Sequence, residues 1–178
     1  MTERRLSRGL IQVYTGDGKG KTTCALGLAF RAVGQGFKVA MVQFIKGRET
    51  GESRAAARLA PDLTLRFFGR PGRFNLKAPA PDDLARIREA WDFACQVMEA
   101  GEHDLVILDE INLALNHGLI PLEEALALLR RRPAWVEVVL TGRRAPRELL
   151  DLADLVTEMQ PVKHYFQAGV RARRGIEW

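Results

Sequence analysis

A chain of 178 residues is long enough to form one domain with a buried core, and 47% apolar with 28% charged residues is ordinary for a soluble globular protein. The net charge of +5 is scattered and forms no basic run interleaved with aromatic residues. We therefore expect no nucleic-acid partner and favour an anionic small ligand. No stretch approaches the roughly 18 apolar residues of a membrane span, and the polar start lacks the apolar core of a signal peptide. We expect a cytoplasmic protein with no membrane partner.

Six apolar runs predict strands, at residues 10–14, 38–44, 63–68, 105–109, 136–141 and 154–159. Helical patterns lie between them, at residues 22–33, 82–100, 122–132 and 147–152. Strands that alternate with helices predict a parallel sheet covered on both faces, whose strands end on one ligand-binding edge. We expect one domain over residues 1–178, with a polar N-terminal arm at 1–8 and a tail at 161–178 packed on the domain.

Two segments that follow strand ends are rich in glycine, proline and charge, at residues 46–53 and 69–81. We predict that both are loops over the ligand-binding edge and candidates for substrate recognition. The two cysteines, Cys24 and Cys95, lie far apart, each in a helical apolar pattern. A disulfide framework or zinc site needs more cysteines at close spacing, so we expect two small core residues.

The run TGDGKGKTT (15–23) directly follows the first predicted strand and precedes the first predicted helix, which is the setting of a P-loop. Its glycines allow successive backbone N–H groups to turn toward a phosphate, and a helix N-terminus favours an anion. Lys21 supplies an ammonium for the phosphate oxygens, and Thr22 a hydroxyl for Mg²⁺. The one departure is Thr15, at the place of the pattern's first glycine. The predicted ATP-binding residues are Gly16, Asp17, Gly18, Lys19, Gly20, Lys21, Thr22 and Thr23.

A second motif, VILDE (106–110), ends a predicted strand in two acids, as the acidic partner of a P-loop does. We predict a Mg²⁺ site formed by Thr22, Glu110 and Asp109. The two motifs together predict an α/β fold: a single-domain P-loop NTPase-like (RecA-like) three-layer sandwich with a mainly parallel sheet of about six strands.

The two motifs leave three classes of function open: a small-molecule kinase, an ATPase or regulatory NTP-binding protein, and an enzyme that uses another part of ATP. Arg143, after the fifth strand, suits an arginine finger or a residue that neutralises phosphates within its own site. Asp17 or Glu110 could serve a kinase as the base. Periodicity and spacing do not choose between these classes.

The chain resembles the P-loop type ATP:corrinoid adenosyltransferases from residue 10 onward. The likeness is carried by TGDGKGKTT, VQFIKG (42–47), VILDE, LTGR with a following Ala-Pro (140–146), and a string of matches between Ala153 and Glu177. The resemblance implies that the protein transfers the 5′-deoxyadenosyl group of ATP to the Co(I) of a reduced corrinoid. Triphosphate is released, in adenosylcobalamin biosynthesis or salvage. An ATPase or a kinase releases ADP instead.

The resemblance also implies how the residues act. Co(I) is a strong nucleophile, so positioning and charge neutralisation suffice and no protein base is needed. The implied catalytic residues are Lys21, Thr22, Glu110 and Arg143, with Mg²⁺. Phe74, on the loop before the long helix, is the implied corrinoid contact. A homodimer is implied too, as is an external reductase or flavoprotein that donates electrons, because the chain has no flavin or iron–sulfur motif.

Overall fold

The strands form one six-stranded, all-parallel sheet in a computed structural model that describes residues 6–72, 74–76 and 78–177. The sheet order is β3-β2-β4-β5-β1-β6. The bounds are β1 (Ile11–Thr15), β2 (Val39–Gln43), β3 (Leu63–Phe67), β4 (Leu105–Asp109), β5 (Glu137–Thr141) and β6 (Leu155–Glu158). Each of the six predicted strands is confirmed, with ends that shift by at most one residue.

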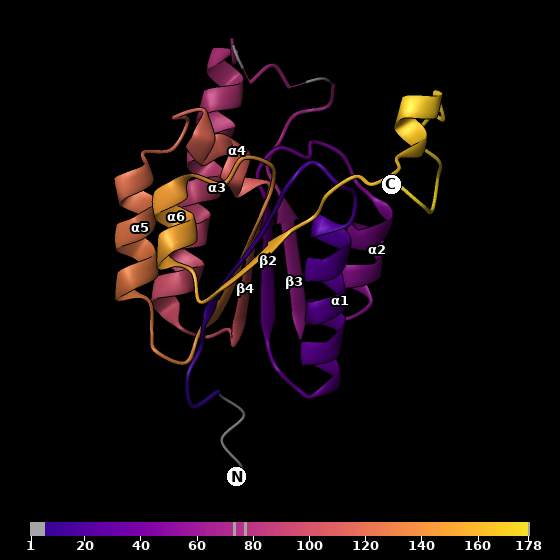
Figure 1. Cartoon of the computed structure of the whole chain (residues 1–178). Helices are drawn as coiled ribbons and strands as arrows, with labels where there is room; N and C mark the ends of the chain where they lie inside the picture. The colour runs from indigo at the N-terminus through magenta and orange to yellow at the C-terminus, as the bar shows by residue number, and fades with distance from the viewer. Residues whose placement is uncertain (1–5, 73, 77, 178) are drawn as a thin grey trace.

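Helices lie on both sides of this sheet and give the predicted three layers (Figure 1). One side carries α1 (Lys21–Gly34) and α2 (Gly51–Ala57). The other side carries α3 (Pro81–Ala100), α4 (Ile111–Asn116), α5 (Leu122–Arg131) and α6 (Arg147–Leu152). The single-domain α/β fold is therefore confirmed.

The core lies against the two faces of the sheet. All five residues of β2 and of β4 are buried, because these strands occupy the middle of the sheet with helices on both sides. The face of α1 toward the sheet presents Ala25, Ala29 and Ala32, whose spacing keeps them on one side of a helix. Small side chains there let the helix that follows the P-loop pack close to the strands.

Four details of the prediction were wrong. The segment at 46–53 is not a loop throughout, because α2 begins at Gly51, where the Thr50 N–H donates to the Ser53 Oγ at 2.9 Å. The helix α4 and the 3₁₀ helix η1 (Tyr165–Ala168) were not predicted. The four residues of β6 are exposed, so the sheet is not covered at that edge. Cys24 is also exposed, because it lies beside the buried alanine stripe of α1 rather than in it.

The chain after β6 passes over the end of the sheet near α1 and α2 and projects from the domain with η1 (Figure 1). Residues 1–5 of the expected polar arm lie outside the described residues. Among the helices that the structure describes, none is both long and apolar enough to cross a membrane.

Candidate nucleotide-binding site

A cavity of about 800 Å³ opens over the P-loop, at the edge where the strands end. The loop, the start of α1, the segment after β2, the ends of β4 and β5, and the C-terminal tail all line it. Its charged and hydroxyl-bearing wall includes Asp17, Lys19, Lys21, Thr22, Thr23, Lys46, Glu52, Glu110, Arg143 and Glu177. The structure thus brings residues from most of the chain to one cavity.

Lys21 places its ammonium inside the P-loop. Its Nζ donates to the carbonyl oxygens of Gly16 at 2.7 Å and Gly18 at 2.6 Å, and the residue is only 8% exposed. Burial lowers the pKa of Lys21 below its ordinary value, although nearby carboxylates oppose that shift. A phosphate held by the loop N–H groups would give this buried cation the opposite charge that it lacks.

Residue 18 must be glycine both for the loop and because the chain after β6 packs directly against it. The Gly18 N–H donates to the Met159 carbonyl oxygen at 2.6 Å. A Cβ at this position would lie 2.7 Å from that oxygen and 2.8 Å from the carbonyl carbon, which is too close for any side chain. Met159, directly after β6, therefore fixes the position of the middle of the P-loop.

We expect Gly18→Ala to lower the free energy of unfolding by about 1–3 kcal/mol, because the added methyl must push two backbone segments apart. Thermal denaturation measures the change. Gly27→Ala is the matched control, since no atom lies within 4 Å of the added methyl on the exposed face of α1. That control should gain about 0.5–1 kcal/mol. Equal stability of the two variants would contradict the close contact.

Asp109 is buried beneath the cavity and fully hydrogen-bonded. Its Oδ1 accepts from the Thr22 and Thr141 hydroxyls, each at 2.7 Å. Its Oδ2 accepts from Gln43 Nε2 at 3.0 Å and lies 3.5 Å from Lys46 Nζ. The carboxylate ties the start of α1 to the ends of three strands, and its side chain is 0% exposed. Three hydrogen bonds and one ion pair therefore fix the position of this carboxylate.

Glu110 faces the cavity from a left-handed backbone conformation with φ of 66°. Its N–H donates to the Thr141 hydroxyl at 3.0 Å, which helps to hold this unfavourable conformation. Gly142 passes so close that a Cβ there would lie 3.3 Å from Glu110 Oε2. Burial raises the pKa of Glu110, and repulsion from Asp109 adds to the shift. The site thus holds a carboxylate that lacks sufficient positive charge.

We expect Glu110→Gln to raise the melting temperature at pH 7 while activity falls roughly 10- to 100-fold. The folded-state pKa is raised, so ionisation costs stability as the pH rises from the ordinary glutamate value toward that raised pKa, and the full cost is reached once the pH lies above it. The gain should shrink as the pH falls and the wild-type carboxyl becomes protonated. Melting curves at several pH values measure it, with exposed Glu89→Gln as control. A melting temperature of Glu110→Gln below that of the wild type at pH 7 would contradict the claim that ionised Glu110 destabilises the fold.

Among the described residues, three further cations line the cavity, and each lies near a carboxylate. Arg143 Nε is 3.6 Å from Asp17, and Lys19 Nζ is 3.7 Å from Glu177. Lys46 Nζ is 2.8 Å from Glu52. Burial alone would lower the pKa of Lys46, but the Asp109 and Glu52 carboxylates outweigh it and raise the pKa.

Sequence reasoning did not assign Gln43, Glu52 or Glu177 to the site. Gln43 lies inside an apolar strand pattern, and Glu52 in a segment predicted as loop. Glu177 reaches the P-loop from 158 positions away, and no local pattern predicts so distant a contact. The one signal for Glu52 was the prediction that residues 46–53 lie over the ligand-binding edge, and Lys46 begins that segment.

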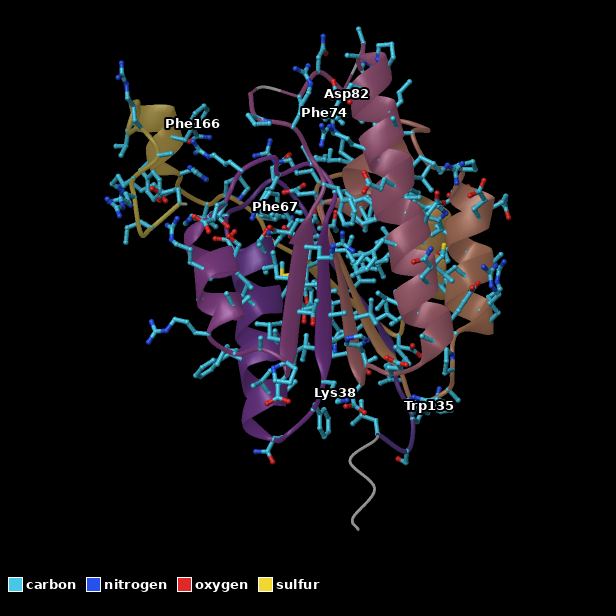
Figure 2. All side chains as sticks on the ribbon, turned by 180° about the vertical axis from the view of Figure 1, so that it is seen from behind. Lys38, Phe67, Phe74, Asp82, Trp135 and Phe166 are labelled. Atoms are coloured by element: carbon cyan, nitrogen blue, oxygen red, sulfur yellow. The ribbon has the colours of Figure 1, made fainter. Side chains whose placement is uncertain are left out.

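The predicted residues of the P-loop and the two acids lie together, but Phe74 does not line the cavity. Phe74 is half-buried and packs against the larger core cluster. Figure 2 shows it beside the start of α3, far from Phe166 on the tail. Its loop is held to α3 by Arg70, whose guanidinium donates to the buried Asp83 carboxylate at 2.5 Å and 3.3 Å.

Comparison with known proteins agrees with this geometry. Residues 7–178 match the family model for "ATP:corrinoid adenosyltransferase BtuR/CobO/CobP". A protein named corrinoid adenosyltransferase from Pseudomonas aeruginosa is 40% identical over 100% of this chain and 88% of its own length. One of the same name from Escherichia coli K12 is 42% identical over 96% of this chain and 86% of its own length.

A solved structure with a similar fold is the flagellar accessory protein FlaH from Methanocaldococcus jannaschii. The TM-score is 0.59 at 15% identity, covering 86% of this chain and 72% of that one. At this identity the likeness concerns the fold alone, and it agrees with the predicted P-loop NTPase-like, RecA-like architecture.

Proposed function

The chain belongs to the ATP:corrinoid adenosyltransferase family, and we propose that the cavity over residues 16–23 binds the ATP on which this transferase acts. The protein is an enzyme that transfers the adenosyl group of ATP to a corrinoid. The observation that carries the proposed site is the buried ammonium of Lys21 inside the glycine loop. Three more cations, Lys19, Lys46 and Arg143, line the same cavity.

The proposed chemistry is a nucleophilic displacement at the 5′ carbon of ATP. The electron pair of Co(I) forms a cobalt–carbon bond, the carbon–oxygen bond to the phosphate chain breaks, and inorganic triphosphate leaves with that bonding pair. The leaving group carries the developing negative charge, so the protein's work is to position and neutralise it. We assign Lys21 as the main counter-charge, Lys19 as the second and Arg143 as a third from the end of β5.

The oxygen ligands at the site fit Mg²⁺, which prefers oxygen donors such as carboxylates and hydroxyls. Glu110 faces the cavity, and burial with repulsion from Asp109 raises its pKa, so a cation bound there would stabilise its ionised form. Asp109 holds the Thr22 hydroxyl beneath it. We propose that Thr22 and Glu110 hold the ion, with Asp109 behind them. Bound there, Mg²⁺ would neutralise part of the phosphate charge.

We propose that Phe74 contacts the corrinoid, as the resemblance implies, from the loop that Arg70 and Asp83 hold against α3. Because Phe74 packs on the core and not in the ATP cavity, this contact would lie beside that cavity. Its role would be to help displace the lower cobalt ligand, which eases reduction of Co(II).

We expect Phe74→Ala to slow the reaction roughly tenfold when it starts from Co(II) corrinoid with a mild reductant, the lower end of the loss seen when a residue that positions the ligands of a metal is removed. The reaction from preformed Co(I) should change less. Rates from both starting states measure the difference, and exposed Phe67→Ala, from the neighbouring strand β3, is the control. Equal slowing from both states would remove Phe74 from this role.

Reducing the cobalt requires an electron donor, which we propose is an external reductase or flavoprotein. The chain has two cysteines, whereas an iron–sulfur cluster uses four thiolates in its ordinary form.

We also propose a cytoplasmic homodimer. The exposed edge strand β6, where Leu155 and Val156 are 43% and 44% exposed, offers one apolar surface for such contact.

Identification of the phosphate product tests the proposed function. Incubation with Mg-ATP and a chemically reduced corrinoid should yield inorganic triphosphate in step with corrinoid conversion, detected by phosphorus NMR. An ATPase or small-molecule kinase would form ADP. Formation of ADP without a change in the corrinoid would contradict the proposal.

A further inference from the structure

Lys19, Lys21, Lys46 and Arg143, the lysine and arginine side chains that the described residues bring to the cavity, each already have an oxygen partner within the protein. Lys21 lies on two loop carbonyls, and the others lie near three carboxylates from different parts of the chain. These pairs are Lys46–Glu52 at 2.8 Å, Arg143–Asp17 at 3.6 Å and Lys19–Glu177 at 3.7 Å. A site built only for affinity toward a polyanion would not face acidic side chains into its own cavity, since each one repels phosphate.

Glu177 is the most firmly held of these carboxylates. It accepts from the Tyr165 hydroxyl, and from the Arg173 backbone N–H at 2.6 Å and guanidinium at 3.2 Å. The hydrogen bonds from Arg173, with that from Tyr165, lower the pKa of Glu177 to about 2, so the group is ionised at neutral pH. Its side chain is 16% exposed, whereas that of Lys19 is 41% exposed and free to turn toward a ligand.

Glu52 holds Lys46 in a corresponding way from the first turn of α2. The Glu52 side chain is 17% exposed and lines the cavity. Hydrogen bonding and charge from Lys46 outweigh burial and lower the pKa of Glu52, so this carboxylate is also ionised at neutral pH. Two separate segments, α2 and the tail, therefore each present a fixed negative charge to a cation of the phosphate site.

The chemistry of the proposed reaction suggests what the Glu52 and Glu177 carboxylates do. Inorganic triphosphate keeps all the phosphate groups of ATP, so cations that bind those groups hold the product as well as the substrate. A carboxylate that remains beside the cation competes with the bound triphosphate for it and so lowers the affinity for the product. Resting on the proposed function, we propose that Glu177 and Glu52 are internal counter-anions that compete with triphosphate for Lys19 and Lys46 and so promote release of the product.

Titration calorimetry of the full chain with inorganic triphosphate and Mg²⁺ tests this. We expect Glu177→Gln to bind triphosphate roughly two- to fivefold more tightly than the wild type, the range that exposed ion pairs give. Glu52→Gln should tighten binding in the same sense and provides an independent test if the tail variant is unstable. The differences should shrink at high salt, because the competing pairs are partly exposed.

Two controls separate charge from structure. Tyr165→Phe removes a hydrogen bond to Glu177 but keeps the carboxylate beside Lys19, so its affinity for triphosphate should stay at the wild-type value. Glu148→Gln, at an exposed position of α6, tests whether any lost negative charge has the same effect. Unchanged or weaker binding by both cavity variants, or equal tightening in either control, would overturn the inference.

A negative result for the counter-anions can be distinguished from failure of the proposed function, because the calorimetry measures triphosphate binding alone, without corrinoid. If the wild type binds triphosphate and the variants bind it equally well, the counter-anion proposal is wrong but the phosphate site is retained. A wild-type protein that binds no triphosphate loses the site itself.

Discussion

Replacing Lys21 with alanine should weaken ATP binding and lower the rate of turnover roughly 100- to 1,000-fold, the range found when one preorganised charge-stabilising donor is removed. The ammonium lies inside the loop itself, on the carbonyls of Gly16 and Gly18. Its removal takes away the charge nearest to the loop N–H groups. Calorimetry with ATP and the rate of corrinoid adenosylation measure the two effects.

Lys38→Ala is the matched control, because Lys38 is exposed at the opposite edge of the sheet, just before β2 (Figure 2). It should bind ATP and react as the wild type does. Near-normal kinetics in Lys21→Ala would contradict the assignment of residues 16–23 as the phosphate site.

Asp109→Asn should lower both stability and activity. An amide places an NH₂ group among the donors from Thr22, Thr141 and Gln43, and at least one contact is lost within the core. A buried hydrogen-bonding group left without its partner costs about 1–3 kcal/mol in the free energy of unfolding. Thr22 also loses the acceptor that orients its hydroxyl, so we expect the rate to fall roughly 10- to 100-fold.

Asp104→Asn distinguishes the two effects. Asp104 is also buried, directly before β4 and so at the other end of that strand, and its Oδ2 accepts from the Lys38 N–H at 2.9 Å. This variant should lose stability but keep the wild-type rate constant. If Asp109→Asn lost stability and kept its rate as well, the network around Asp109 would be structural only.

Local signals were sufficient to predict the P-loop and the sheet. Glycine, lysine and threonine between an apolar strand and a helix have few other uses, and β4 runs over the residues that were predicted, Leu105–Asp109. The helix α2 was missed because it is only seven residues long and opens with glycine. Cys24 was misplaced because an apolar periodicity does not fix which side of its stripe meets the sheet.

The contacts that complete the site could not be predicted, because they join residues far apart in the sequence. Gln43 and Asp109 are 66 positions apart, and Lys19 and Glu177 are 158 apart. The first pair depends on the order of the strands in the sheet and the second on the path of the tail, and the composition of a segment encodes neither. The same holds for Gly18, whose need to be glycine comes from the carbonyl of Met159.

The most direct test of the central claim is the corrinoid product itself. Mixing the protein with Mg-ATP and Co(I) corrinoid, then recording the absorption spectrum before and after illumination, reports whether a light-sensitive cobalt–carbon bond has formed. We predict that bond in the wild type, one triphosphate for each adenosylated corrinoid, and neither product in Lys21→Ala. A corrinoid spectrum that light does not change, together with ADP, would contradict the account.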